Sequence, residues 1–128
     1  MTVQDLYNSA LALMGNKSDD RFHDFTIAAV NQMYGDLFEI NNRIRLDGGL
    51  PALETVPTAS LFTDTIEYDD RLAKTAMPYG LAARLAMDDG DMARIQWLNN
   101  QYYACAQSCR RFVCQKIVDA YALTEDEQ

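Results

Sequence analysis

The chain has 128 residues, 48% of them hydrophobic, and 19 acidic against 11 basic side chains give a formal net charge of -8. This length allows one domain with its own core and no need for disulfide or metal staples. The negative charge argues against a protein that coats nucleic acid by neutralising phosphates, although it permits one that lies beside nucleic acid without adhering.

The cysteines and the N-terminus indicate the cellular compartment in which the protein is made. Cys105, Cys109 and Cys114 fall in one expected helix, and their odd number disfavours a secreted disulfide framework. The N-terminus lacks the basic region and apolar run of a signal peptide. No apolar stretch approaches the roughly 20 residues that a membrane-spanning helix needs. We therefore expect a protein made in a reducing cytoplasm, with no membrane partner.

Two amphipathic helices are expected first. Residues 2–14 begin with Thr2 and Asp5, which resemble a capping box, and Gly15 suits a left-handed helix stop. The second helix spans about residues 21–45, where apolar side chains recur at steps of three or four. This stripe consists of Phe22, Phe25, Ala29, Met33, Leu37, Ile40 and Ile44.

The helical pattern breaks over residues 46–70, which contain two glycines and two prolines. Residues 60–68 are rich in β-branched and aromatic side chains, so we expect extended chain there, or a short hairpin. Such a long connection is either a plain crossover linker or an arm that contacts a partner. The arm is favoured because the segment is too apolar for a solvated linker. We expect deletion of residues 48–59 to spare the fold but to hinder assembly.

A third helix is expected from a cap at Asp69 or Asp70 to about residue 87. It contains Pro78, and proline in a helix interior costs about 3 kcal/mol, so either packing holds this helix together or a bend there is useful. Its small residues would let a neighbouring helix approach closely. They are Ala73, Ala76, Gly80, Ala82, Ala83 and Ala86.

Gly90 then turns the chain, with Asp89 or Asp91 as a cap, into a fourth helix over about residues 91–123. The apolar side of this helix begins with Met92, Ile95, Leu98, Tyr102, Cys105 and Cys109. Residues 124–128 form an acidic tail. The sequence thus predicts a mainly α protein, a four-helix domain over residues 1–123 with a long extended, β-like loop (46–70) between helices 2 and 3.

No catalytic residue, cofactor or metal site is expected. Cys105 and Cys109 could face one metal, but zinc needs two further ligands and the single histidine, His23, has no local partner. A cysteine–histidine nucleophile would need His23 to meet one of the thiols across the fold. The acidic residues 88–91 lack the staggered ligands and distal glutamate of a calcium loop. We interpret the thiols as small buried hydrophobes.

The candidate site residues are partner-binding ones. Trp97 and Tyr103 lie off the apolar stripe of the fourth helix, and exposed aromatic residues are enriched at interfaces. Arg110, Arg111 and Lys116 form a basic cluster, which we interpret as a solvated or partner-facing edge in preference to a DNA-binding patch. The loop contributes the apolar residues Leu50, Leu53, Leu61 and Phe62.

Several segments, in this order, resemble the head-to-tail adaptor (connector) proteins of tailed bacteriophages. They are residues 3–7 (Val-Gln-Asp-Leu-Tyr), the loop with Pro51 and Pro57, residues 60–66 (Ser-Leu-Phe-Thr-Asp-Thr-Ile), residues 78–85 (Pro-Tyr-Gly-Leu-Ala-Ala-Arg-Leu) and residues 100–103 (Asn-Gln-Tyr-Tyr). The resemblance implies a virion protein of the neck. Such proteins form a homo-oligomeric ring, typically dodecameric, that binds the portal protein and the next neck or tail protein.

The resemblance also implies how the chain is used. The fourth helix would dock against the portal, and residues 46–68 would contact neighbouring subunits or the next tail component. An acidic ring around the DNA channel would repel phosphates, so genomic DNA would pass without specific binding. The alternative is a small helical nucleic-acid-associated regulatory protein that uses Arg110, Arg111 and Lys116. An enzyme is disfavoured because no nucleophile–base pair or pair of carboxylates stands out.

Overall fold

A computed structural model describes the backbone of residues 1–15 and 20–126, and the surroundings of the side chains in these ranges except at 20–21, 88–89 and 110–126. The described backbone is mainly α-helical, as predicted. Its elements are α1 (Val3–Leu13), α2 (Asp20–Asp47), the π-helical turn η1 (Leu72–Ala76), α3 (Met77–Leu85), the 3₁₀ turn η2 (Ala86–Asp89) and α4 (Met92–Asp126).

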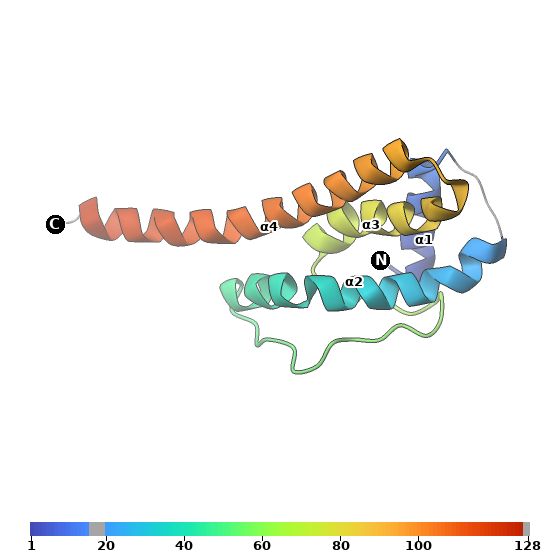
Figure 1. Cartoon of the computed structure of the whole chain (residues 1–128). Coiled ribbons are helices and arrows are strands. Elements are labelled where there is room, and N and C mark those ends of the chain that lie inside the picture. Colours follow the sequence, from blue (N-terminus) through green and yellow to red (C-terminus); the bar gives the residue numbers. More distant parts are fainter. Residues whose placement is uncertain (16–19, 127–128) are drawn as a thin grey trace.

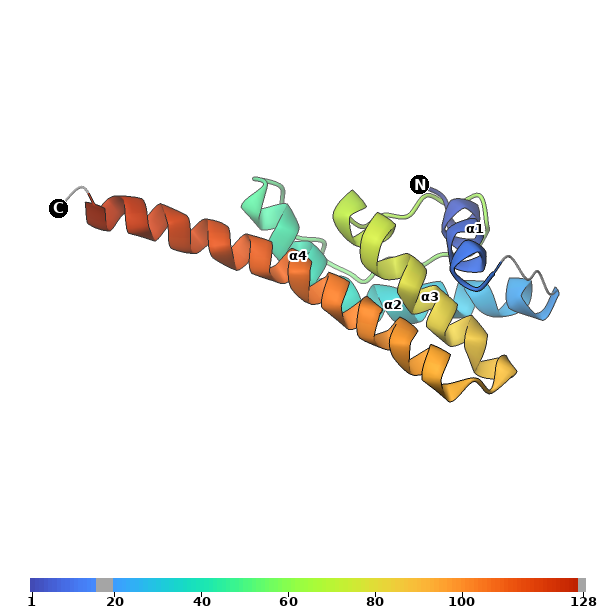
Figure 2. The same cartoon turned by 90° about the horizontal axis from the view of Figure 1, so that it is seen from above.

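The helices are stacked around α3. Figure 1 shows α2 beneath α3, α4 above it and α1 across one end, with the connection between α2 and η1 running below α2. Seen from above, α3 lies between α4 and α1 (Figure 2). The core lies between these elements, and its largest fully buried apolar side chains are Leu6, Met33, Tyr34, Leu72, Met77, Leu81, Leu85, Leu98 and Tyr102.

Close approach of the helices depends on the predicted small residues, which lie in η1, in α3 and at the start of η2. All six of them are buried. At Gly80 a Cβ atom would lie 2.7 Å from the Met33 sulfur and 2.7 Å from Cδ1 of Tyr102. Because real Cβ atoms do not come this close to their neighbours, only glycine allows α2 and α4 to meet α3 at this level.

The chain stays helical through Pro78 because a π turn precedes it. The N–H of Met77 donates to the carbonyl of Leu72, five residues back instead of four. Pro78 therefore falls in the first turn of α3, where its missing N–H costs little. The single helix expected over residues 69–87 is thus a π turn, an α-helix and a 3₁₀ turn in succession.

Two residues assigned to apolar stripes lie outside the core. Phe25 is 46% exposed because Thr26 takes the inward position, and its hydroxyl is satisfied by the carbonyl of Phe22. Met92 is 71% exposed because it is the first residue of α4, just after the turn at Gly90. Gly90 has the expected left-handed conformation (φ 71°) and the Asp91 carboxylate accepts the N–H of Arg94, so the turn forms as predicted.

Candidate partner-binding surfaces

The connection between α2 and η1, residues 48–69, is called the arm below. It first runs antiparallel to α2 and is bound there by two asparagine side chains. Asn42 donates to the Leu53 carbonyl (3.3 Å) and accepts the Leu53 N–H (2.9 Å). Asn31 makes the same pair of bonds with Ala59, at 3.1 and 2.7 Å. Each amide therefore pairs with one backbone residue much as a neighbouring β-strand residue would.

The spacing of the two asparagines fits this arrangement. Positions 31 and 42 are about three helical turns apart, so both side chains leave α2 on the same face. Leu53 and Ala59 are held against that face, and their backbone groups are satisfied although the arm forms no sheet.

The arm then turns against the start of α1. The N–H groups of Val3 and Gln4 donate to the carbonyls of Asp64 (2.9 Å) and Phe62 (3.0 Å). Thr2 and Asp5 complete the predicted capping box. The unpaired N–H groups at the beginning of α1 are thereby satisfied, partly by the helix's own cap and partly by the arm.

Side chains also fix this turn. The Asp64 carboxylate accepts the N–H groups of Ser60 and Leu61 at 2.8 and 2.9 Å, and these bonds hold the pKa of Asp64 below its usual value. The Phe62 ring stacks on His23 with ring centres 3.8 Å apart, and Tyr7 meets Phe62 edge-on at 5.5 Å. His23 is thus part of an aromatic cluster around the arm.

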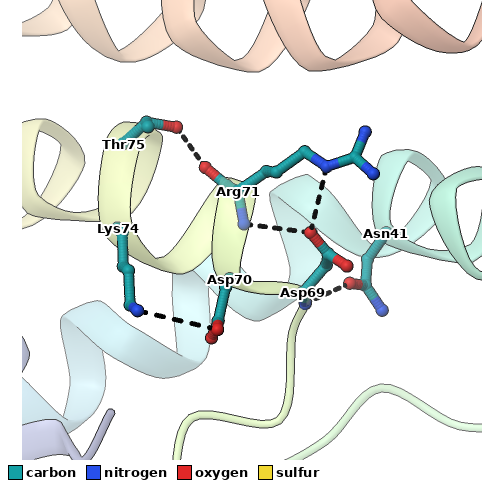
Figure 3. A network of polar contacts seen from close by, with 6 residues as sticks. All are labelled: Asn41, Asp69, Asp70, Arg71, Lys74 and Thr75. Atoms are coloured by element: carbon teal, nitrogen blue, oxygen red, sulfur yellow. Dashed lines mark hydrogen bonds and ion pairs between the residues drawn. The ribbon is translucent and has the colours of Figure 1, made fainter.

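The last part of the arm returns along α2 and starts the third helical segment. The N–H of Asp69 donates to Asn41 Oδ1 (2.8 Å), and the Asp69 carboxylate accepts the N–H of Arg71 (2.9 Å), as a helix cap does (Figure 3). Just before it, the Tyr68 hydroxyl donates to the carbonyl of Tyr34. The arm is therefore tied to α2 or α1 along its length, which a plain crossover linker would not require.

These contacts divide the predicted arm residues into two groups. Leu53 and Phe62 are partly buried against the core, so their side chains serve the fold. Leu50 and Leu61 are exposed, together with Val56, which we had not singled out. Leu50, Val56 and Leu61 are called the outer arm residues below. Val56 lies between two residues pinned to α2, Leu53 and Ala59, and only the structure reveals which way it faces.

A second exposed surface lies on α4. Trp97 and Tyr103 are 51% and 63% exposed, in keeping with the prediction that they lie off the buried stripe. Trp97 meets the half-buried ring of Tyr79 edge-on, with ring centres 5.9 Å apart. The two rings form an aromatic ridge across α3 and α4.

A polar cluster joins the three helices behind this surface. Arg84 of α3 pairs with Asp36 of α2 at 2.8 Å, and the Tyr102 hydroxyl of α4 donates to the same carboxylate at 3.2 Å. Burial and the nearby Asp36 charge raise the pKa of Tyr102 well above its usual value, so its hydroxyl remains a donor. The cluster fixes the position of α4 against α2 and α3.

A groove runs over η1 and the start of α3, beside α4. It consists of two hollows of about 360 and 550 Å³ that share Thr75 and Cys105. The first extends to Cys109, and the second to Pro78, Tyr79 and the C-terminal half of α1. It is called the η1 groove below. The position of this groove could not be predicted from the sequence, because it depends on how α4 crosses the π turn.

The cysteines of the groove show no sign of reactivity. Cys109 is buried, Cys105 is partly buried, and burial raises the pKa of both thiols. His23 contacts Tyr7 and Phe62 on the arm side. Within the residues described, no three His, Cys, Asp or Glu side chains are placed to hold a metal ion. No helix of this part of the chain is long and apolar enough to cross a membrane.

The predicted basic cluster lies outside the described side chains, since Arg110, Arg111 and Lys116 belong to the distal part of α4. Comparison with known proteins gives no further guidance. The sequence matches no protein-family model and no curated protein, and no solved structure matches it.

Proposed function

We propose that this chain is a structural protein of a bacteriophage neck. In this role it forms a ring that joins the portal to the tail and extends the DNA channel. The sequence resemblance to head-to-tail adaptors suggests the assembly, and one structural observation carries the proposal. That observation is the length of α4 relative to the other helices.

The helix α4 continues well past the body of the molecule. Figures 1 and 2 agree that its C-terminal part extends beyond the ends of α2 and η1. Residues 110–126 would add about 25 Å of helix at 1.5 Å per residue. The sequence of this part retains apolar residues at helical spacing, among them Val113, Ile117 and Tyr121.

A projecting amphipathic helix is typical of a chain that docks into a groove of another protein. Helices gain most of their stability from packing of an apolar face, so a partner for this part of α4 is expected. In a phage neck that partner would be the portal. The net charge of -8 suits the lining of a DNA channel, because it weakens adhesion of the duplex.

Co-purification with the portal protein of the same phage genome tests this proposal. The full chain should form a complex whose mass, measured by native mass spectrometry, shows several copies of the chain per portal ring. A chain ending at Cys109 should keep the helical circular-dichroism signal of the body and lose portal binding. Failure of the full chain to bind the portal would refute the proposal. Tight binding to linear duplex at moderate salt would favour the regulatory alternative.

A further inference from the structure

The η1 groove has the chemistry of a docking site. Apart from Arg71 and Lys74 its lining is uncharged, and no acidic side chain is among the described residues that line it. The two basic side chains leave the helix on different sides (Figure 3), and each has an acidic neighbour, Asp69 at 3.9 Å and Asp70 at 3.6 Å, outside the groove. The groove is therefore a mainly uncharged channel in which the two charged lining side chains are basic, each with a carboxylate beside it.

The arm presents the complementary chemistry on the other side of the molecule. Its outer residues are apolar and exposed, whereas its charged residues, Glu54, Asp64, Glu67 and Asp69, are all acidic. Figure 1 shows the first part of the arm below α2, whereas η1, α3 and α4, which line the groove together with the C-terminal half of α1, lie above α2. Leu50 and Val56 belong to this first part of the arm, so α2 lies between them and the groove of their own chain.

We propose that the outer arm residues of one copy dock into the η1 groove of the next copy. This inference rests on the proposed ring, for which it specifies the contact between subunits. Two different surfaces on opposite sides of one chain make a heterologous contact, which generates a ring when the rotation between subunits closes. The arm is already ordered by Asn31 and Asn42, so docking requires little further loss of conformational entropy.

Disulfide trapping between two single-thiol variants tests the contact. One variant carries Val56→Cys and alanine at all three native cysteines. The other keeps only Cys105, which lies in the groove. Both are mixed at about 1 mM, where contacts with millimolar Kd are populated, and oxidised in mildly alkaline buffer because burial raises the pKa of the Cys105 thiol. The expected product is mainly the mixed dimer.

A matched control replaces the Val56→Cys substitution by Ala28→Cys, which puts the thiol on an exposed position of α2. This control should give roughly tenfold less mixed dimer. Equal yields from the two thiols, or mainly homodimers of the Val56→Cys variant, would overturn the proposal. Melting curves establish that each cysteine-depleted variant is folded.

Charge reversal provides a second test in the native cysteine background. Lys74→Glu and Glu54→Lys should each reduce chemical cross-linking between copies, and the double variant should restore it. If neither reversal changes cross-linking while portal-bound rings still form, the arm–groove contact is wrong and the proposed function stands. If the contact is trapped but the chain does not bind the portal, the proposed function fails and the contact stands.

Discussion

The arm side and the groove side of this molecule are held in place by different interactions. On the arm side, order comes from a few polar side chains that bind the backbone of an irregular segment. On the groove side, it comes from small residues that let α2, α3 and α4 come into close contact. The arm should therefore respond to loss of single hydrogen bonds, and the groove side to added volume. Both surfaces expose apolar side chains, but only the groove side is enclosed by regular helices.

The largest effect is expected from volume added at Gly80. Gly80→Val should destabilise the protein by about 3 kcal/mol or more, because the new side chain would collide with Met33 and the buried ring of Tyr102. Urea unfolding followed by circular dichroism measures the change. Gly35→Ala is the matched control, since nothing lies within 4 Å of its Cβ position, and it should stabilise α2 by up to about 1 kcal/mol. Similar effects at the two glycines would contradict the account of close helix approach.

The next largest effect is expected on the arm. Asn42→Ala and Asn31→Ala should each cost about 1–3 kcal/mol, because the backbone groups of Leu53 or Ala59 lose both partners. Hydrogen exchange should show faster exchange at the amides of these two residues and unchanged exchange in α3. Asn100→Ala, at an exposed position of α4, is the control and should stay within about 0.5 kcal/mol. Unchanged exchange in the arm would mean that packing alone orders it.

How far the sequence could anticipate this structure differs between the two sides. Periodicity predicted the helices, because each has an apolar face with a clear repeat, and capping chemistry predicted the ends at Thr2, Gly15 and Asp91. The small-residue seam was also foreseen. The π turn before Pro78 was not predicted. A proline in a helical sequence indicates that the regular hydrogen-bond pattern is interrupted, but it does not indicate which pattern replaces it.

The arm was foreseen as extended chain but not as part of the fold. Asparagines at positions 31 and 42 have no signature of their own in a helical sequence, and their partners are backbone groups. For the same reason the deletion of residues 48–59 can no longer be expected to spare the fold, since it would remove Leu53 and Ala59 from the face of α2. The outward direction of Leu50, Val56 and Leu61 is likewise a product of these bonds.

A smaller effect on stability is expected at the aromatic ridge. Trp97→Ala should cost about 1 kcal/mol, because half of the side chain is already exposed and its main described ring contact is the edge of Tyr79. If the ridge contacts a partner, the same variant should greatly weaken binding to the portal-bound ring, measured by native mass spectrometry. Leu98→Ala, at a fully buried neighbouring position, should instead cost about 2–5 kcal/mol. A loss at Trp97 as large as that at Leu98 would place the ridge in the core.

The smallest effect is expected from the charge at the turn of the arm. The backbone bonds from Ser60 and Leu61 lower the pKa of Asp64 in the folded state. Such a group stabilises the fold above its unfolded pKa, about 3.9, and loses this contribution as the pH falls through the lower folded value. Asp64→Asn should therefore be less stable than wild type near neutral pH, and the gap should close in acid. Urea midpoints at several pH values measure this, with Glu39→Gln as an exposed control on α2. A gap that is independent of pH would show that the shape of the Asp64 side chain orders the turn, and not its charge.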